Sequence, residues 1–355
     1  MNKPLGRLLL TFTGVCLLAV TARAYEIWGP HRGVNVGPRI TEPDIADLAK
    51  TKATLVRASF GEIPFVDKTP PHVFNEEAFA RLRNIVDWCE KYGLRVIVDP
   101  HTMPGLRRPW TCEFQDVFWQ DRKWHEYLIQ TWKRIATEYK DRGDVIAGYD
   151  LLNEPATPRG PPEGPSDWNH LVAVLVRTIR ATGDRHTIIV EPTATHGPQG
   201  EYISRVQSLR FLQLPADARI VVSPHTYQPH AFTHQGAEGN PKGVRYPGKV
   251  GEREWNRDAL RESLQVIRRF QEENKVPILI GEFSASRFAG PDGEAYLKDL
   301  IGLFEGYGWS WAYHDYRTSR EWDPEMGSPD FQELPRDPNT SRMRLLREYF
   351  AGSTR

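Results

Sequence analysis

Short, continuously apolar runs rich in β-branched residues recur along the chain, and longer segments with helically spaced apolar positions lie between them. Continuous apolar runs, in contrast to strict alternation, are typical of parallel strands that are covered on both faces. The strands that this pattern predicts are residues 34–36, 54–58, 95–99, 145–152, 187–191, 219–223, 277–283 and 308–313.

The segments between these runs have the start and stop signals of helices. Thr41 stands where an N-cap is expected, because the acidic residues Glu42 and Asp44 follow it. Asn75 opens a segment whose apolar residues form one stripe, and Gly93 closes it. The other predicted helices are residues 119–140, 166–181, 255–274, 292–307 and 341–350, and the weakest helical pattern is that of residues 201–214.

Eight strand and helix units follow one another in alternation, without a polar linker or a change of composition. This order predicts an α/β chain that folds as a single (β/α)8 TIM barrel, with residues 25–355 as one domain. An open, doubly wound sheet is the alternative, and it is less favoured because no glycine-rich dinucleotide turn or P-loop follows the first strand. The Pro- and Gly-rich segments 157–165 and 240–251 are predicted to be loops over the mouth of the barrel.

The first 24 residues have the pattern of a secretory signal peptide. Lys3 and Arg7 precede an apolar run over residues 8–20, and Ala22 and Ala24 supply the small residues of a cleavage site after Ala24. A membrane anchor is the alternative, but the run is shorter than the roughly 20 residues that cross a bilayer. We therefore expect a secreted or periplasmic protein that has no membrane association after cleavage.

The overall composition is that of an ordinary globular protein. Lys and Arg number 46, as do Asp and Glu, and no basic block occurs, so nucleic acid is not an expected partner. Cys89 and Cys112 are too few for a disulfide scaffold and are expected to be unpaired. We expect the protein to be a monomer.

Two glutamates stand at the ends of predicted strands. Asn153 and Glu154 close the fourth strand, and Glu282 closes the seventh. A barrel brings the carboxyl ends of its strands together at one mouth, so side chains that are far apart in sequence become neighbours there. A lone glutamate at such a place could cap a helix or pair with an arginine, and the residues around it decide between these roles.

Matches on successive strands make the chain resemble glycoside hydrolase family 5, the cellulase-type family within the clan of retaining (β/α)8 glycosidases. The resemblance covers nearly the whole chain after the signal peptide, and the segments 232–238 and 243–247 are similar to a further local signature of some members. The positions that carry it are Arg57, His101, Asn153-Glu154-Pro155, His225, Tyr227, Glu282 and Trp311.

The resemblance implies that Glu154 is the general acid/base and Glu282 the nucleophile. The chemistry of the residues supports these roles, because retaining hydrolysis needs two carboxyl groups about 5 to 5.5 Å apart, one protonated and one ionised. Arg57 and Tyr227 are expected to donate hydrogen bonds to Glu282 and to keep it anionic, so the proton should reside on Glu154.

Four further residues would bind or orient the substrate, as the resemblance implies. Asn153 would hydrogen-bond the 2-hydroxyl of the sugar, and His101 and His225 would orient the acid or bind hydroxyl groups. Trp311 would stack under the sugar in the reacting subsite. Candidate stacking surfaces for outer sugar units, each of which could equally be a packing residue, are Trp110, Trp119, Trp168, Phe232 and Trp322.

Other chemistries have weaker support in the sequence. His225, His230 and His234 could suggest a metal cluster, but no HxH or HExxH pattern accompanies them, and we expect neither a metal nor a cofactor. No GxSxG motif of a serine hydrolase occurs. Asp99 and Asp150, within strands, are expected to form networks inside the barrel, and the role of Glu191 remains open.

Taken together, the residues predict an exported retaining β-glycosidase whose substrate is a β-linked polysaccharide or oligosaccharide. An endo-β-1,4-glucanase is the favoured activity. The alternatives are a β-mannanase or an exo-acting β-glucosidase, since the family resemblance spans these substrates. A barrel that binds carbohydrate without catalysis is the alternative from a different class, and it is disfavoured because both glutamates are present with their Arg and Tyr partners.

Overall fold

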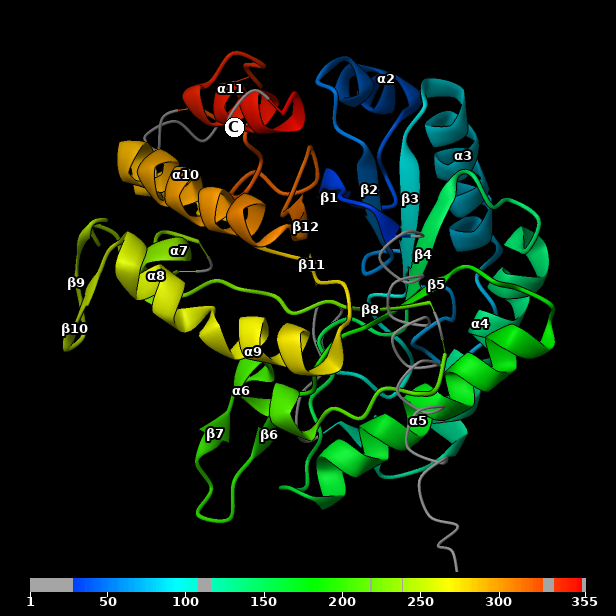
Figure 1. Ribbon diagram of the computed structural model, residues 1–355. Coiled ribbons are helices and arrows are strands. Elements are labelled where there is room, and N and C mark those ends of the chain that lie inside the picture. Colours follow the sequence, from blue (N-terminus) through cyan, green and yellow to red (C-terminus); the bar gives the residue numbers. More distant parts are fainter. Residues whose placement is uncertain (1–27, 108–115, 218, 238, 328–334, 353–355) are drawn as a thin grey trace, which may run out of the picture.

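The computed structural model describes residues 28–107, 116–217, 219–237, 239–327 and 335–352, and the proposed signal peptide lies outside this part (Figure 1). Eight parallel strands form the central sheet. They are β1 (Arg32–Val36), β2 (Leu55–Ser59), β3 (Arg95–Asp99), β4 (Ile146–Asp150), β5 (Thr187–Val190), β8 (Ile220–Val222), β11 (Leu279–Ile280) and β12 (Ser310–Tyr313). Every strand that the apolar runs predict is present, with ends that differ by a few residues.

The sheet closes into a barrel. Its strand order is β11-β12-β1-β2-β3-β4-β5-β8, so β8 and β11 are the two ends. A parallel bridge between Val222 and Ile278 joins them. The Val222 N–H donates to the carbonyl of Pro277 at 3.1 Å, and the Thr226 N–H donates to the carbonyl of Glu282 at 3.0 Å. The predicted (β/α)8 barrel is therefore confirmed, and the open sheet is excluded.

Helices surround the ring of strands, with α3, α4 and α5 on one side and α8, α9 and α10 on the other (Figure 1). The longer helices are α2 (Glu42–Lys50), α3 (Glu76–Tyr92), α4 (Lys123–Tyr139), α5 (Glu163–Ala181), α8 (Arg257–Ser263), α9 (Gln265–Asn274), α10 (Gly290–Tyr307) and α11 (Ser341–Phe350). Shorter turns are α6 (Arg205–Ser208), α7 (His230–Thr233) and the 3-10 helices η1 (Val117–Trp119), η2 (Leu209–Phe211) and η3 (Arg287–Ala289). None of the helices in the described part of the chain is both long and apolar enough to cross a membrane.

Helix α3 illustrates how local sequence sets these boundaries. The Asn75 side chain accepts a hydrogen bond from the Glu77 N–H at 3.1 Å and so satisfies a free donor of the first turn. Gly93 ends the helix with φ of +75°, a left-handed conformation that costs glycine little. The predicted stripe is buried, including Cys89, which is a free thiol. Cys112 lies outside the described residues.

Two segments differ from their predicted form. Residues 201–214 do not form one helix: β6 (Thr195–His196) and β7 (Tyr202–Ile203) pair as a hairpin, and Ser204 then caps α6 by accepting from the Gln207 N–H. Residues 255–274 form two helices, α8 and α9, which are separated at Leu264. The Ser263 hydroxyl donates to the Leu260 carbonyl just before this break, and such side-chain hydrogen bonds compete with the helical ones.

The two Pro- and Gly-rich segments are also partly ordered. Helix α5 already begins at Glu163, and β9 (Gly248–Val250) pairs with β10 (Arg253–Trp255) in a hairpin. No described residue of 157–165 or 240–251 lines the cavity at the barrel mouth, which neighbouring segments form instead.

The interior of the barrel changes from apolar to polar along the strands. An apolar cluster with one residue from each of six strands, together with a tryptophan that precedes β1, fills one end: Trp28, Leu55, Ile97, Ala147, Ile189, Val221 and Leu279. Successive side chains of a strand point to opposite faces, so residues two positions further on also point inward. Arg57, Asp99 and Glu191 occupy such positions after Leu55, Ile97 and Ile189. The polar layer therefore lies toward the carboxyl ends of the strands.

Trp311 does not lie in this interior, and its predicted role beneath a sugar is wrong. The side chain is fully buried on the outer face of β12, where its ring stacks on Phe350 of α11 at 5.4 Å between centroids. Its indole N–H donates to Glu305 of α10 at 2.8 Å. The small residue Ser310 faces the interior and accepts from the Trp28 indole, so Trp311 must face the helices.

We predict that Trp311→Ala lowers the free energy of unfolding by about 3 to 5 kcal/mol, because it removes a large ring from a packed layer. Urea unfolding followed by circular dichroism measures this. Trp322→Ala is the matched control, since Trp322 is only partly buried and lines the cavity, and it should change stability by less than about 1.5 kcal/mol. An unchanged stability of Trp311→Ala would contradict the packing role.

Candidate active site

A cavity of about 1290 Å³ opens at the carboxyl ends of the strands. Both predicted catalytic glutamates line it, Glu154 after β4 and Glu282 after β11. His101 after β3, and His225 and Tyr227 after β8, line the same cavity. The closure of the barrel thus brings together side chains that are distant in sequence, as expected.

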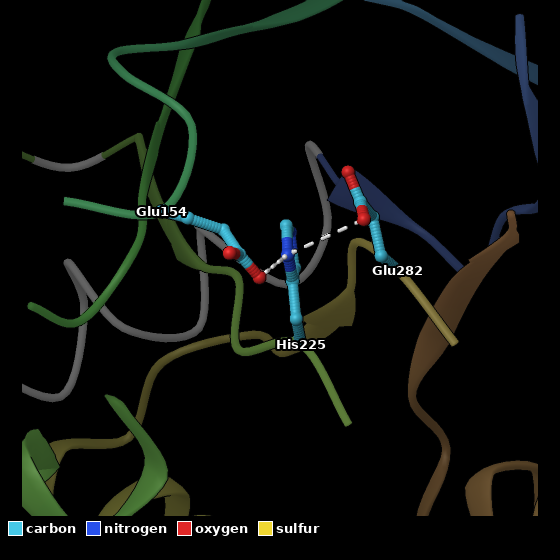
Figure 2. A group of neighbouring side chains, drawn as sticks. All are labelled: Glu154, His225 and Glu282. Atoms are coloured by element: carbon cyan, nitrogen blue, oxygen red, sulfur yellow. Dashed lines mark hydrogen bonds and ion pairs between the residues drawn. The ribbon is translucent and has the colours of Figure 1, made fainter. Parts of the chain in front are cut away.

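The two carboxylates flank one imidazole. Figure 2 shows Glu154 and Glu282 directed at the His225 ring from opposite sides. One oxygen of each carboxylate and one nitrogen of His225 all lie within 4.8 Å of one another. Carboxyl groups about 5 to 5.5 Å apart fit direct attack by one of them, whereas inverting enzymes need about 6.5 to 9.5 Å to admit a water. The spacing suits a double displacement.

Glu282 is held as an anion. The Arg57 guanidinium donates to its Oε1 at 2.7 Å, and the Tyr227 hydroxyl donates to its Oε2 at 2.9 Å, which are the two contacts predicted from the sequence. Burial would raise the pKa of Glu282, but His225, His314 and Arg57 lower it well below its ordinary value. Burial and the charge of Glu282 raise the pKa of Tyr227, so its hydroxyl keeps the proton that it donates.

Arg57 connects Glu282 to three further acids in the barrel interior. Its fully buried guanidinium donates to Asp150 at 2.9 Å and to Glu191 at 3.0 Å, and it lies 3.1 Å from Asp99. The predicted interior networks of Asp99 and Asp150 are therefore present. Burial and the charge of Glu191 raise the pKa of Asp150 well above its ordinary value, so Asp150 is the acid of this group that most readily takes up a proton.

Glu154 has a different environment. His225 Nδ1 lies 3.0 Å from its Oε1, and Arg205 Nη1 lies 3.4 Å from its Oε2. Its backbone has φ of +45°, which is rare for a residue other than glycine, and its N–H donates to the Glu191 carboxylate at 2.8 Å. A fifth of the Glu154 side chain is exposed to the cavity, whereas Glu282 is 8% exposed.

The charges around Glu154 favour its ionised form in the unliganded site, whereas the sequence led us to expect the proton on this residue. Burial would raise the pKa of Glu154, but Arg205 and His225 lower it to about 2. Burial opposes the charged imidazole, but Glu191, Glu282 and Glu154 raise the pKa of His225 well above its ordinary value. His225 therefore holds a proton one hydrogen bond away from Glu154.

His101 and Asn153 are both connected to Arg57, His101 through Asp99 and Asn153 directly. His101 lines the cavity, and its Nδ1 lies 2.6 Å from Asp99. Burial opposes its charged form, but Asp99 raises the pKa of the imidazole overall. Asn153 is 1% exposed, and its Oδ1 accepts from Arg57 at 3.0 Å. Contact of these two residues with a sugar remains a prediction.

The candidate stacking residues separate into two groups. Trp168 and Phe232 are fully buried, and Trp119 is partly buried with its ring edge-on to Trp168, so these residues pack the core. Trp322 lines the cavity, with its ring 6.1 Å from that of Tyr227. Trp110 lies outside the described residues.

Three residues that the sequence did not single out also line the cavity. His314 follows β12, and its Nδ1 lies 3.6 Å from Glu282. Tyr202, on β7, is 55% exposed, and Arg205 follows it on α6. Strict alternation along β12 could have indicated His314, because Ser310 and Ala312 are small and face inward. Tyr202 and Arg205 belong to the segment with the weakest helical pattern, which carried no such signal.

The geometry also bears on metal binding. In the described part of the chain, Glu154, His225 and Glu282 form the only group of three potential ligands. His230 and His234 are outside it, since their rings stack face to face at 3.7 Å. Arg57 and Arg205 already supply positive charge to the two carboxylates, so the arrangement fits acid–base chemistry better than a metal centre.

Known proteins share this fold and sequence pattern. The sequence matches the Cellulase family, glycosyl hydrolase family 5, over residues 19–319. Endoglucanase C of Acetivibrio thermocellus is 26% identical over an alignment of 311 positions that covers 78% of this chain and 84% of that protein. The crystal structure of endoglucanase Cel5A from Thermotoga maritima has a TM-score of 0.66 and 25% identity, covering 86% of this chain and 94% of that one.

A complex of the same Thermotoga maritima Cel5A with mannotriose has a TM-score of 0.70 and 23% identity, and covers 92% of this chain and 99% of that one. The family match spans most of the chain and includes both glutamates at the barrel mouth. The chain therefore belongs to glycosyl hydrolase family 5 and is an O-glycosyl hydrolase that acts on a polysaccharide or oligosaccharide.

Proposed function

We propose that the protein is a retaining endo-β-1,4-glucanase in which Glu282 is the nucleophile and Glu154 the general acid/base. The observation that carries this proposal is the spacing of the two carboxylates, whose oxygens approach within 4.8 Å on either side of His225. This spacing leaves no room for a water between an inverting pair and favours attack by Glu282 itself.

In the first step, a Glu282 oxygen forms an ester bond with the anomeric carbon while the glycosidic C–O bond breaks. The leaving oxygen needs a proton, which His225 Nδ1 supplies to Glu154 Oε1 across 3.0 Å and Glu154 passes on. The leaving sugar departs as a neutral alcohol. Arg57 and Tyr227 keep Glu282 ionised and oriented for the attack.

In the second step, Glu154 is an anion and takes a proton from a water molecule. The water oxygen bonds to the anomeric carbon, the ester bond breaks, and Glu282 regains its negative charge, while the proton taken by Glu154 returns to His225 across their hydrogen bond. The low pKa of Glu154 suits this step, since the base must be free of its proton. Asn153 would hydrogen-bond the 2-hydroxyl in both transition states.

The substrate assignment rests on the relatives and on the shape of the cavity. Endoglucanase C supports a β-1,4-glucan, and the Cel5A complex with mannotriose makes a β-mannan the second candidate. The cavity of about 1290 Å³ is lined by Pro38 and Gly61 and by Trp255 and Val266 as well as by the two glutamates, and this size supports binding of several sugar units and endo action. The complete set of partners around Glu282 disfavours a barrel that only binds carbohydrate.

We also propose that the enzyme is exported and monomeric. The positive residues, apolar run and small residues of the first 24 positions support a cleaved signal peptide and a secreted or periplasmic enzyme. We propose that the enzyme works there as a monomer, because each side chain assigned to the chemistry comes from one chain.

A substrate panel tests the activity. Purified protein should release phenolate from an aryl β-cellobioside, and it should depolymerise soluble β-1,4-glucan faster than β-mannan. Reducing-end assays and product profiling by chromatography measure both, with a mixture of oligosaccharides expected from endo action. Faster mannan cleavage would change the substrate, and no turnover on any β-glycan would favour the binding-only barrel.

Glu282→Ala should lower kcat by about four orders of magnitude or more, because the nucleophile is gone. Azide should partly restore turnover of a 2,4-dinitrophenyl β-cellobioside and yield the α-glycosyl azide, since it attacks from the side that Glu282 vacates. The exposed Glu273→Ala on α9 is the matched control and should keep wild-type rates. Near-normal activity of Glu282→Ala would refute the assignment.

Glu154→Ala should reduce turnover of substrates with poor leaving groups by about 10² to 10⁴, and that of dinitrophenyl glycosides much less in the first step. Azide should here give the β-glycosyl azide, because it attacks the glycosyl-enzyme in place of water. Steady-state kinetics over a series of leaving groups measures the difference. An equal loss across the series would contradict the role of Glu154 as the acid.

A further inference from the structure

Between β5 and β8, the chain forms the β6–β7 hairpin and α6, which lie below α9 (Figure 1). The first residue of α6, Arg205, lines the cavity with a side chain that is 16% exposed. Ser204 fixes the start of this helix by accepting from the Gln207 N–H, and Ser208 Oγ donates to the Thr193 carbonyl. The position of Arg205 is thus set by the fold.

Arg205 holds Glu154 at two points. Its Nη2 donates to the backbone carbonyl of Glu154 at 2.6 Å, and its Nη1 lies 3.4 Å from the Glu154 carboxylate. The planar fork of a guanidinium can make two such contacts at once, which the single ammonium of lysine does not match.

The backbone of Glu154 needs such support. Its φ of +45° lies in the left-handed region, which is unfavourable for a residue with a Cβ unless neighbouring groups fix it. The Glu191 carboxylate binds the N–H of Glu154 at 2.8 Å, and Arg205 binds its carbonyl. The backbone N–H and carbonyl of Glu154 are therefore both bound by charged side chains, the N–H by Glu191 after β5 and the carbonyl by Arg205 on α6.

We propose that Arg205 is a positioning residue of the reaction: it holds the left-handed backbone of Glu154 and stabilises the carboxylate form that acts as the base in the second step. The inference rests on the proposed acid/base role of Glu154. Arg205 need not touch the substrate, and it acts through the residue that does.

The charges around Glu154 come from several elements. The groups that face it are Arg205 on α6, His225 and Tyr227 after β8, His234 after α7, Glu191 after β5 and Glu282 after β11. His225 is shared among three carboxylates, since its Nε2 lies 3.3 Å from Glu191 and its Nδ1 lies 3.7 Å from Glu282. Removal of Arg205 should therefore raise the pKa of Glu154 even though His225 remains.

Loss of the Arg205 charge affects the two steps at opposite ends of the pH profile. The first step draws its proton from the Glu154–His225 pair, and loss of the Arg205 charge raises the proton affinity of this pair, so the alkaline limb of kcat/KM moves to higher pH. The second step needs ionised Glu154, so the acidic limb of kcat moves to higher pH when breakdown of the glycosyl-enzyme limits the rate. A residue with only a structural role would lower the rates and leave both limbs in place.

The test compares Arg205→Met with Arg205→Lys in the full chain. The probes are cellotetraose for kcat/KM and 2,4-dinitrophenyl β-cellobioside for kcat. We expect Arg205→Met to move both limbs upward by about one pH unit and to lower kcat at the optimum at least tenfold. Arg205→Lys keeps the charge but loses the fork, so it should retain the wild-type limbs with a reduced rate.

Arg177→Met, on the exposed face of α5, is the matched control and should behave as wild type. If Arg205→Met does not fold, as judged by circular dichroism, Arg205→Gln carries the same test, since its amide can still donate to the Glu154 carbonyl. Unmoved limbs in the folded neutral variant would overturn the proposal. Near-normal kinetics of Glu154→Ala would instead overturn the proposed function, so the two failures are distinguishable.

Discussion

The buried guanidinium of Arg57 is the interaction on which the site depends. It lies within hydrogen-bonding distance of four carboxylates, those of Asp99, Asp150, Glu191 and Glu282. Several acids cannot share a dry interior without compensation, because the desolvation of each charge costs several kcal/mol. The fixed cation of Arg57, the raised pKa of Asp150 and the raised pKa values of His101 and His225 offset these negative charges, and the pKa of Glu282 stays well below its ordinary value beside the cavity.

The division of labour between the glutamates follows from what surrounds each of them. Glu282 is bound by a cation and a phenol that do not change their protonation, so its charge is constant until it attacks. Glu154 is bound by His225, which carries a mobile proton, and it is more exposed to the cavity. A fixed anion next to an acid that exchanges its proton is the asymmetry that a double displacement requires.

The sequence predicted the barrel and the strand-end residues because both depend on local patterns. Apolar runs mark the strands, and Glu154 and Glu282 follow directly from them. The predicted role of Trp311 is wrong because a continuous apolar run does not indicate which of its side chains face the barrel interior. The contact of Arg205 with Glu154 could not be predicted, since Arg205 belongs to a segment whose path is set by tertiary packing. Glu191 stands at the end of a predicted strand, but the sequence does not show that its carboxylate accepts from the Glu154 N–H. Whether Glu154 or His225 carries the proton likewise depends on distances between charged side chains, and these distances cannot be read from the sequence.

The junction between β8 and β11 has a consequence for how the enzyme loses activity. It is formed by one bridge and a few backbone hydrogen bonds, and His225 lies on one side of it and Glu282 on the other. Separation of β8 from β11 exposes little apolar surface compared with unfolding of the whole barrel, so this separation has a lower free-energy cost. We therefore expect heat to separate these two side chains, and so to stop the chemistry, before the surrounding helices unfold.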